Sequence, residues 1–263
     1  MGQHVCAAVR TAGHPVWAPD RFDTSWLHSQ HGSVVFAAGL TADFRQRPLD
    51  TVDTHVGLLA QMLRHTPFER MVYLSSTRVY SGQSRTDEDA PLLVRPTDSS
   101  DLYNLSKLMG ESLCMAHPER HISVLRLSNV VGGLPVQADS FLGMLWAEAQ
   151  RGHIHLQAHP ESAKDYIHIN EVVNAVLAAL GQNTPRIYNV ASGFNLTHRD
   201  WAIALSGIAG ATWSGDESAA KWSFPIICNT RLRAELGVPP LHTPEGLLHS
   251  VANELPLSRA LAQ

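Results

Sequence analysis

The stretch Arg70-Met71-Val72-Tyr73-Leu74-Ser75-Ser76 decides the fold, together with Tyr103-Asn104-Leu105-Ser106-Lys107 further along the chain. The first is a short apolar run that ends in serines and predicts a buried strand, and the second lies in a stretch with helical periodicity. The same alternation recurs, with further strands expected at 15–18, 33–39 and 122–127 and helices at 5–12, 52–63, 102–115 and 171–180. Strands that alternate with helices of this length predict an α/β fold with a doubly wound, mostly parallel sheet.

The alternation breaks up after residue 131. Segments 132–164 and 191–263 carry Gly, Pro, Trp and His in irregular order, and they predict a smaller lobe over the strand ends without a clean linker. Ligands of doubly wound sheets bind at the carboxyl ends of the strands. Four residues are expected at those ends, namely Asp20, Gly39, Ser76 and Asn129.

The composition excludes several classes of protein. Of the 263 residues 44% are apolar and 17% are charged, and the net charge is −4, so the chain is not a disordered one. Without a basic stripe, nucleic acid is not expected as a partner. The sequence contains no run of 18 apolar residues, so no membrane-spanning helix is expected. The three cysteines lie far apart in the sequence, which indicates a reducing, cytoplasmic location.

Tyr103 and Lys107 are four residues apart and therefore project from one face of the expected helix. A nearby ammonium group favours the phenolate and would lower the tyrosine pKa from its usual value of about 10. Such a tyrosine can exchange a proton with a substrate hydroxyl. Ser76 ends the preceding strand, so its hydroxyl could bond the same substrate oxygen. The alternative for Tyr103 and Lys107 alone is an ordinary solvated helix face.

The order of motifs resembles the extended short-chain dehydrogenase/reductase superfamily, and within it the NAD-dependent epimerase/dehydratase family. The resemblance covers roughly residues 2–195. Its motifs are Ser75-Ser76 with Val79-Tyr80, Tyr103-x-x-Ser106-Lys107-x-x-x-Glu111, Leu125-Arg126-Leu127-Ser128-Asn129, Asp165-Tyr166-Ile167-His168-Ile169 and Tyr188-Asn189-Val190-Ala191-Ser192-Gly193. It implies a Rossmann-type dinucleotide-binding domain at 1–131, to which 165–190 returns, and a substrate lobe at 132–164 and 191–263.

The resemblance also implies a role for each site residue. Tyr103 would be the general acid/base, Lys107 its activator and a ligand of the nicotinamide ribose, and Ser76 would orient the reacting oxygen. The expected cofactor contacts are Gly2, Asp20, Ala38, Gly39, Leu40, Tyr103 and Lys107, and the expected substrate contacts are Ser76, Thr77 and Asn129. The possible metal ligands do not recur at a defined spacing, so no metal site is expected.

The cofactor site departs from the family pattern at the start of the chain. Gly2 resembles the third glycine of the dinucleotide-binding loop, so Asp20 stands where the acid that binds the adenosine ribose is expected. This favours NAD, while Arg21 leaves NADP open. The alternative is that Asp20 is an ordinary surface aspartate.

We expect that a first strand and glycine loop lie upstream of an internal Met. The rival explanation is that the sheet lacks its first strand, which would leave backbone groups unpaired. The segment between Asp20 and Val34 is too short for the helix and strand that relatives place there.

Two functions follow from these motifs. The first is an NAD(P)-dependent epimerase or reductase that acts on a small-molecule substrate, a nucleotide-activated sugar. The family resemblance further suggests a homodimer packed through helices, one of which carries Tyr103. A 4,6-dehydratase is disfavoured because Thr77 and Arg78 stand where that subclass carries an acid pair. The second is a cofactor-deficient or non-enzymatic relative with a binding or scaffolding role, which the incomplete cofactor motif favours and the intact Ser76, Tyr103 and Lys107 oppose.

Overall fold

The computed structural model describes residues 1–20, 23–40, 44–133 and 138–255. Its main sheet has four parallel strands in the order β1-β2-β3-β7, which are β1 (His31–Phe36), β2 (Phe68–Ser76), β3 (His121–Leu127) and β7 (Arg186–Val190). The carboxyl ends of these strands lie at one edge of the sheet. The α/β class and the parallel sheet expected from the sequence are confirmed.

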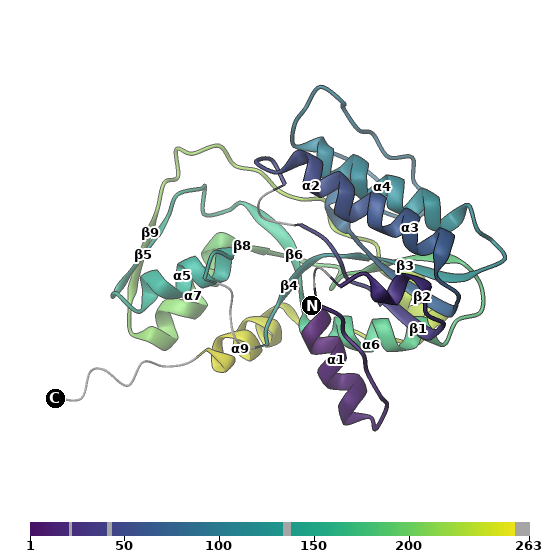
Figure 1. Cartoon of the computed structure of the whole chain (residues 1–263). Helices are drawn as coiled ribbons and strands as arrows, with labels where there is room; N and C mark the ends of the chain where they lie inside the picture. Colours follow the sequence, from purple (N-terminus) through teal and green to yellow (C-terminus); the bar gives the residue numbers. More distant parts are fainter. Residues whose placement is uncertain (21–22, 41–43, 134–137, 256–263) are drawn as a thin grey trace.

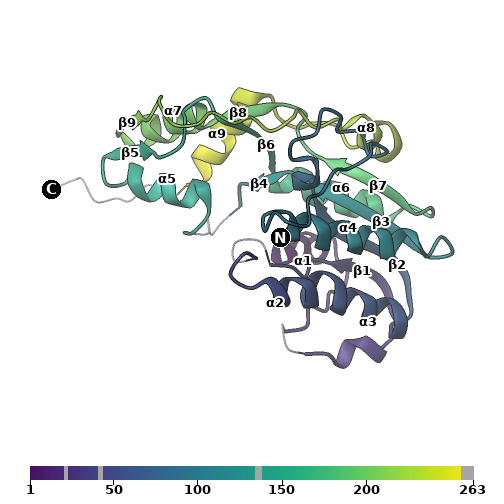
Figure 2. The same ribbon diagram turned by 90° about the horizontal axis from the view of Figure 1, so that it is seen from above.

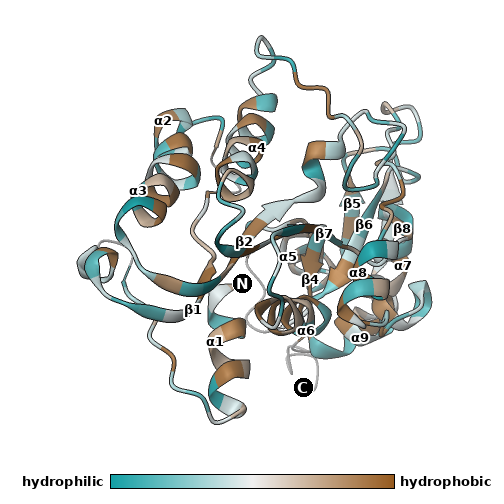
Figure 3. Ribbon diagram, turned by 90° about the vertical axis from the view of Figure 1, so that its right-hand side faces the viewer, coloured by the Kyte–Doolittle hydropathy of each residue, from teal (hydrophilic) through white to brown (hydrophobic). Residues whose placement is uncertain are grey.

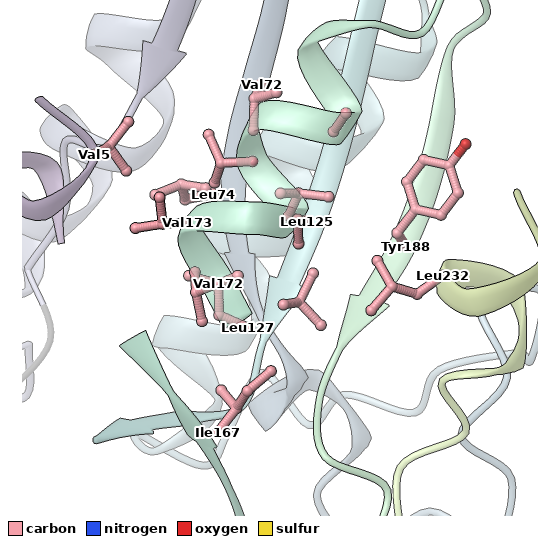
Figure 4. Close-up of a cluster of buried hydrophobic side chains, with 14 of the residues drawn as sticks. Val5, Val72, Leu74, Leu125, Leu127, Ile167, Val172, Val173, Tyr188 and Leu232 are labelled. Atoms are coloured by element: carbon pink, nitrogen blue, oxygen red, sulfur yellow. The ribbon is translucent and has the colours of Figure 1, made fainter. Parts of the chain in front are cut away.

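Helices cover both faces of this sheet (Figures 1 and 3). One face carries α2 (Pro48–Val52), α3 (Leu58–His65) and α4 (Asp101–Met115), and a π-helical turn at Asp53–Gly57 joins α2 to α3. The other face carries α1 (Gly2–Thr11) and α6 (Ile169–Leu180). Alternate side chains of β2 point to opposite faces, as the pleat of a strand requires. Met71 and Tyr73 therefore pack under α3 and α4, while Val72 and Leu74 pack against α6 (Figure 4).

The smaller lobe lies beside the main sheet, joined where β3 leads into β4 (Figure 2). It contains a three-stranded sheet, a two-stranded sheet and three helices: β4 (Asn129–Val131), β6 (Ala163–His168) and β8 (Asn195–Thr197); β5 (His153–Leu156) and β9 (Thr212–Gly215); α5 (Phe141–Ala149), α7 (His198–Ala209) and α9 (Pro244–Glu254). Trp201 and Leu205 are fully buried in its core.

The boundaries of the two lobes differ in two places from the expected ones. Residue 165 falls inside β6, which pairs with β4 and β8, so the chain returns to the main sheet only with α6 and β7. The helix α8 (Thr230–Leu236) was expected in the substrate lobe, but it packs against β7 and α6. Leu232 of this helix is buried against the α6 side of the main core, which explains its position.

The strand expected at 15–18 does not form. Residues 14–20 pair with no strand in the described ranges, and Trp17 is 54% exposed, with its ring stacked on His31 at the start of β1. Pro15 has no N–H to contribute to a ladder, and strand formation depends on a neighbour with free backbone groups. As a result β1 pairs only with β2 in the described part of the chain, and Val34 and Val35 on β1 are only half-buried.

Candidate active site

Ser76, Tyr103 and Lys107 come together at the carboxyl end of β2. Tyr103 and Lys107 lie one turn apart on α4, and both are buried. The Tyr103 side chain forms a hydrogen bond with Ser76. The Lys107 Nζ lies 5.9 Å from the centre of the Tyr103 ring and donates to the carbonyl oxygen of Leu74 at 3.0 Å. The arrangement holds a phenol, a hydroxyl and an ammonium group around one point.

Two cations lie near the Tyr103 ring, since the Lys107 Nζ and the Arg78 guanidinium carbon are each 5.9 Å from its centre. Burial raises the pKa of Tyr103, opposed by the hydrogen bond from Ser76 and by the positive charge of Arg78. Burial also lowers the pKa of Lys107 to about 8, against the opposing charge of Glu111. Burial therefore favours the phenol form of Tyr103 over its phenolate.

The segment Ala38-Gly39-Leu40 follows β1 and approaches the same site. A Cβ on Gly39 would lie 3.1 Å from the His55 Nε2 and 3.5 Å from the Lys107 Nζ, so a side chain there would crowd both groups. Gly39 is exposed and Leu40 is buried. The backbone of this segment therefore passes close to Lys107, where no side chain keeps a ligand away.

His55 is a site residue that the sequence analysis missed. Its Nε2 accepts a hydrogen bond from the Leu40 N–H at 3.1 Å, so the proton is on Nδ1, which donates to the Ser106 Oγ at 2.8 Å. Ser106 in turn donates to the Tyr103 carbonyl oxygen at 2.8 Å. Burial lowers the pKa of His55 to about 3, helped by the charge of Lys107. A signal existed, because a histidine four residues before Leu59 lies on the buried face of the helix.

A buried ion pair lies beneath the site. Arg126 on β3 donates to Glu111 on α4, with the Nη2–Oε2 distance at 2.7 Å, and both side chains are 4% exposed. Glu111 also accepts from the Ser75 Oγ at 2.5 Å, and Arg126 donates to the Tyr80 hydroxyl at 2.5 Å. Ser75 precedes Ser76, so this network fixes the end of β2 against α4 and β3.

On the substrate side, Asn129 is exposed at the start of β4, and its Nδ2 donates to the Asp165 carbonyl oxygen at 2.8 Å. The Asp165 carboxylate accepts from the N–H groups of Ser192 and Gly193 at 3.1 and 2.8 Å, and burial raises its pKa to about 6. Asp165 thus holds the turn after β7 to the smaller lobe. Thr77 is buried in the 3-10 turn Thr77–Tyr80 directly after Ser76.

The expected cofactor residues separate into two groups. Gly2 lies near Ala37, since a Cβ on it would be 3.8 Å from the Ala37 Cβ, and so the start of α1 adjoins the segment 38–40. The Lys107 ammonium has three protons but bonds only to Leu74 among the described residues, which leaves donors for the hydroxyls of a ribose. These residues fit the nicotinamide end of a dinucleotide.

Asp20 is not brought to this group. It is exposed and follows no strand, and Trp17, three residues earlier, stacks on the first residue of β1, at the opposite end of that strand from Gly39. The described residues therefore do not fit the adenosine end. Arg21 lies outside the described residues. In the ranges that the structure describes there is no cluster of three or more metal-ligating side chains, and no helix is long and apolar enough to cross a membrane.

Known proteins resemble the chain in sequence. The model of the NAD-dependent epimerase/dehydratase family matches residues 1–191. A dTDP-glucose 4,6-dehydratase from Streptomyces griseus is 27% identical over 194 residues, which are 69% of this chain and 57% of that enzyme. The match therefore spans little more than half the length of that curated relative.

Solved structures share the fold. UDP-galactose 4-epimerase matches with a TM-score of 0.78 at 20% identity, over 96% of this chain and 94% of that one. With the same coverage, MoeE5 in complex with UDP-glucose and NAD has a TM-score of 0.76 at 18% identity, and RMD from Pseudomonas aeruginosa complexed with NADPH has 0.76 at 23%. These likenesses show the fold, whereas the family model matches most of the sequence itself. The chain belongs to the NAD-dependent epimerase/dehydratase family.

Proposed function

We propose that this protein is an NAD(P)-dependent epimerase or reductase that acts on a secondary hydroxyl or ketone of a nucleotide-activated sugar. The observation that carries the proposal is the grouping of Ser76, Tyr103 and Lys107 at the carboxyl end of a parallel sheet, beside a glycine that leaves the approach to Lys107 open. The family and the nucleotide sugars bound to related proteins support the same class of substrate.

In this proposal each residue has one task. Ser76 holds the reacting oxygen by a hydrogen bond. Tyr103 takes up the hydroxyl proton as the phenolate when the substrate is oxidised, and returns it as the phenol when the ketone is reduced. Lys107 binds the nicotinamide ribose with the ammonium protons that the protein leaves unused, and Asn129 contacts the substrate from β4. When bound, NAD supplies the acceptor for the two electrons and the hydrogen that leave the substrate carbon. His55 positions both sides, because its ring joins Leu40 of the cofactor segment to Ser106 of the catalytic helix.

Thr77 and Arg78 bear on the type of reaction. Elimination of water from a sugar needs an additional acid beside the tyrosine, and neither of these side chains offers a carboxylate. The match to a 4,6-dehydratase therefore supports the family and the substrate class rather than the dehydration step. Epimerisation or reduction needs only the groups that surround Tyr103.

The test is to separate cofactor binding from turnover. NADH and NADPH are titrated by fluorescence, and turnover is then followed with UDP- and dTDP-linked sugars. We expect Tyr103→Phe to lower turnover about 100-fold or more while cofactor affinity stays within about twofold. Tyr188→Phe is the matched control, because Tyr188 is equally buried but bonds Glu235 at 3.2 Å, away from the site. Full turnover in Tyr103→Phe would remove that residue from its role.

A cofactor-deficient relative with a binding role is the second candidate. It is favoured by the position of Asp20, which is exposed and follows no strand within residues 1–20. In that case neither NADH nor NADPH binds at millimolar concentration, and Tyr103→Phe changes no measured property except stability. Cofactor binding in the micromolar range would exclude the cofactor-deficient relative and support the enzyme.

We also propose that the protein forms a homodimer through α2 and α4. These neighbouring helices expose large apolar side chains, with Leu49 at 79%, Val52 at 39% and Met109 at 55% exposure. Apolar exposure of this kind is typical of association surfaces. Sedimentation of the protein should give a dimer, and Met109→Glu should shift it to the monomer; a monomeric wild type contradicts the proposal.

A further inference from the structure

Glu254 is the last residue of α9, and its carboxylate joins three segments of the chain. Its Oε1 accepts a hydrogen bond from the His168 Nε2 at 2.9 Å, and its Oε2 accepts one from the Gly133 N–H at 2.7 Å. A negative charge at the carboxyl end of a helix is unfavourable, because the helix dipole is negative there. The two donors offset that cost and hold the carboxylate where α9 meets the ends of β4 and β6.

His168 presents an N–H group to Glu254 in a fixed orientation. Its side chain is 2% exposed, and its Nδ1 accepts a hydrogen bond from the Asn170 N–H at 3.3 Å, so the ring proton is on Nε2. The bond to Asn170 also caps the start of α6. A ring that turned away from Glu254 would lose this cap, so the two contacts fix each other.

The backbone after β4 fits closely against this pair. Gly132 and Gly133 have φ values of +79° and +76°, in the left-handed region that favours glycine. A Cβ on Gly132 would overlap with the His168 ring and would lie 3.1 Å from the Glu254 Oε2, and a Cβ on Gly133 would overlap with the His4 ring of α1. The chain therefore passes between α1 of the larger lobe and α9 of the smaller one, and Glu254 bonds it from the α9 side.

The strand β4 depends on this contact because it is short. It pairs with β6 over three residues only, and Val131 stands opposite His168 in the last of these pairs. Glu254 closes that end of the pairing, since it bonds His168 and the backbone two residues beyond Val131. Without the carboxylate, two N–H groups lose the acceptor that they have among the described residues, which is unfavourable. The end of β4 would then loosen from β6.

We propose that Glu254 is a positioning residue for the substrate, which acts through β4 on Asn129. This role rests on the proposed function, in which Asn129 contacts the nucleotide-linked sugar. Asn129 is the first residue of β4, and its Nδ2 donates to the Asp165 carbonyl oxygen of β6, so a shift of β4 against β6 moves its side chain. Misplacement by about 1 Å is enough to lower the efficiency of an enzyme about 100-fold. Glu254 lies beyond residues 1–191, which the family model matches, so the family pattern does not include this contact.

The test asks whether Glu254 affects the substrate without affecting the cofactor. Dissociation constants are measured calorimetrically for NADH and, in the presence of NAD, for UDP-glucose and dTDP-glucose. We expect Glu254→Leu to weaken the tighter-binding of these two sugar nucleotides about tenfold. NADH affinity should stay within about twofold, because the two hydrogen bonds of Glu254 go to His168 and Gly133 and not to Lys107.

Glu245→Leu is the matched control, because Glu245 is an exposed glutamate in the first turn of the same helix and forms no hydrogen bond or ion pair with a described residue. It should leave both affinities within about twofold. Asn129→Ala tests the route. If Glu254 acts through Asn129, the addition of Glu254→Leu to Asn129→Ala weakens the sugar nucleotide by less than about threefold more. Losses that multiply in the double variant would place the action of Glu254 elsewhere and overturn the proposal.

Glu254→Gln keeps the size of the side chain and one acceptor oxygen, and it should weaken the sugar nucleotide about threefold. This variant decides the question if Glu254→Leu does not fold, and an affinity equal to that of the wild type overturns the proposal. The proposal is also wrong if Glu254→Leu lowers only the Tm, or weakens NADH and the sugar nucleotide equally, since Glu254 then merely stabilises the fold. A wild type that binds neither sugar nucleotide removes the proposed function itself, whereas normal binding by Glu254→Leu removes this inference alone.

Discussion

The buried pair of Arg126 and Glu111 gives the sharpest prediction of stability. In Arg126→Met the Glu111 carboxylate stays buried with only the Ser75 hydroxyl to bond it, and the Tyr80 hydroxyl loses its donor. An unpaired buried charge of this kind costs about 3–5 kcal/mol of unfolding free energy. Glu111→Leu should cost a similar amount because it leaves the guanidinium unpaired. For a protein of this size such losses lower the Tm by roughly 6–20 °C.

The double variant Arg126→Met/Glu111→Leu distinguishes the contribution of the two charges to stability from the contribution of side-chain packing. Both charges are then gone, and an apolar pair of similar volume is often neutral or stabilising, so we expect a loss of less than about 2 kcal/mol. The assay is urea unfolding followed by tryptophan fluorescence. Arg47→Met is the control, because its ion pair with Asp50 is 41% and 52% exposed and should contribute at most about 0.5 kcal/mol. Single variants that lose less than 1 kcal/mol, or a double variant that loses the sum, would refute this reasoning.

Three further predictions concern the same side of the sheet. Tyr73→Phe should leave stability unchanged or raise it by about 1 kcal/mol, because the Tyr73 hydroxyl is buried without a partner among the described residues; a clear loss in thermal unfolding would contradict this. Gly110→Ala should cost about 1–3 kcal/mol in the same assay, since its Cβ would overlap with that hydroxyl, and a neutral result would show that α4 can shift. The third concerns His55, whose folded pKa of about 3 lies below its unfolded value of about 6.5. The unfolded chain alone binds this proton between these values, so stability should fall as the pH falls from 6.5 towards 3, by up to about 1.4 kcal/mol per unit. Urea unfolding from pH 4 to 7 should show a smaller slope in His55→Asn, and an unchanged slope would exclude His55 as the source.

The elements that local sequence determines could be predicted. Tyr103 and Lys107 lie on one face because they belong to the same helix, and the apolar run at 70–76 has the pattern of a buried strand. The segment 15–18 has the same local character, but a strand exists only when another strand offers its free N–H and C=O groups. Its failure to pair could not be read from the segment itself.

The site residues, too, fall into those that local sequence places and those that contacts between distant segments place. Ser76 could be placed because it ends a strand and the next helix lies above that end. The role of His55 depends on contacts between distant segments, such as its bond to Ser106 across 51 positions. A lowered pKa of Tyr103 was expected from the charge of Lys107 alone, whereas burial, which depends on the whole fold, raises this pKa.

The π-helical turn at Asp53–Gly57 has a consequence for how this chain tolerates change. Such a turn contains one residue more than an α-helical turn, and it is common at functional sites. The wider turn takes up the extra residue, so the helical segments before and after it keep the relative orientation of a regular helix. Deletion of one residue between 53 and 57 should therefore restore a regular helix with α2 and α3 in place, and the change would be confined to the turn, where His55 contacts Leu40 and Ser106. The turn thus allows the contacts of His55 to change while the outer surface of the helix layer, with the exposed Leu49, stays the same.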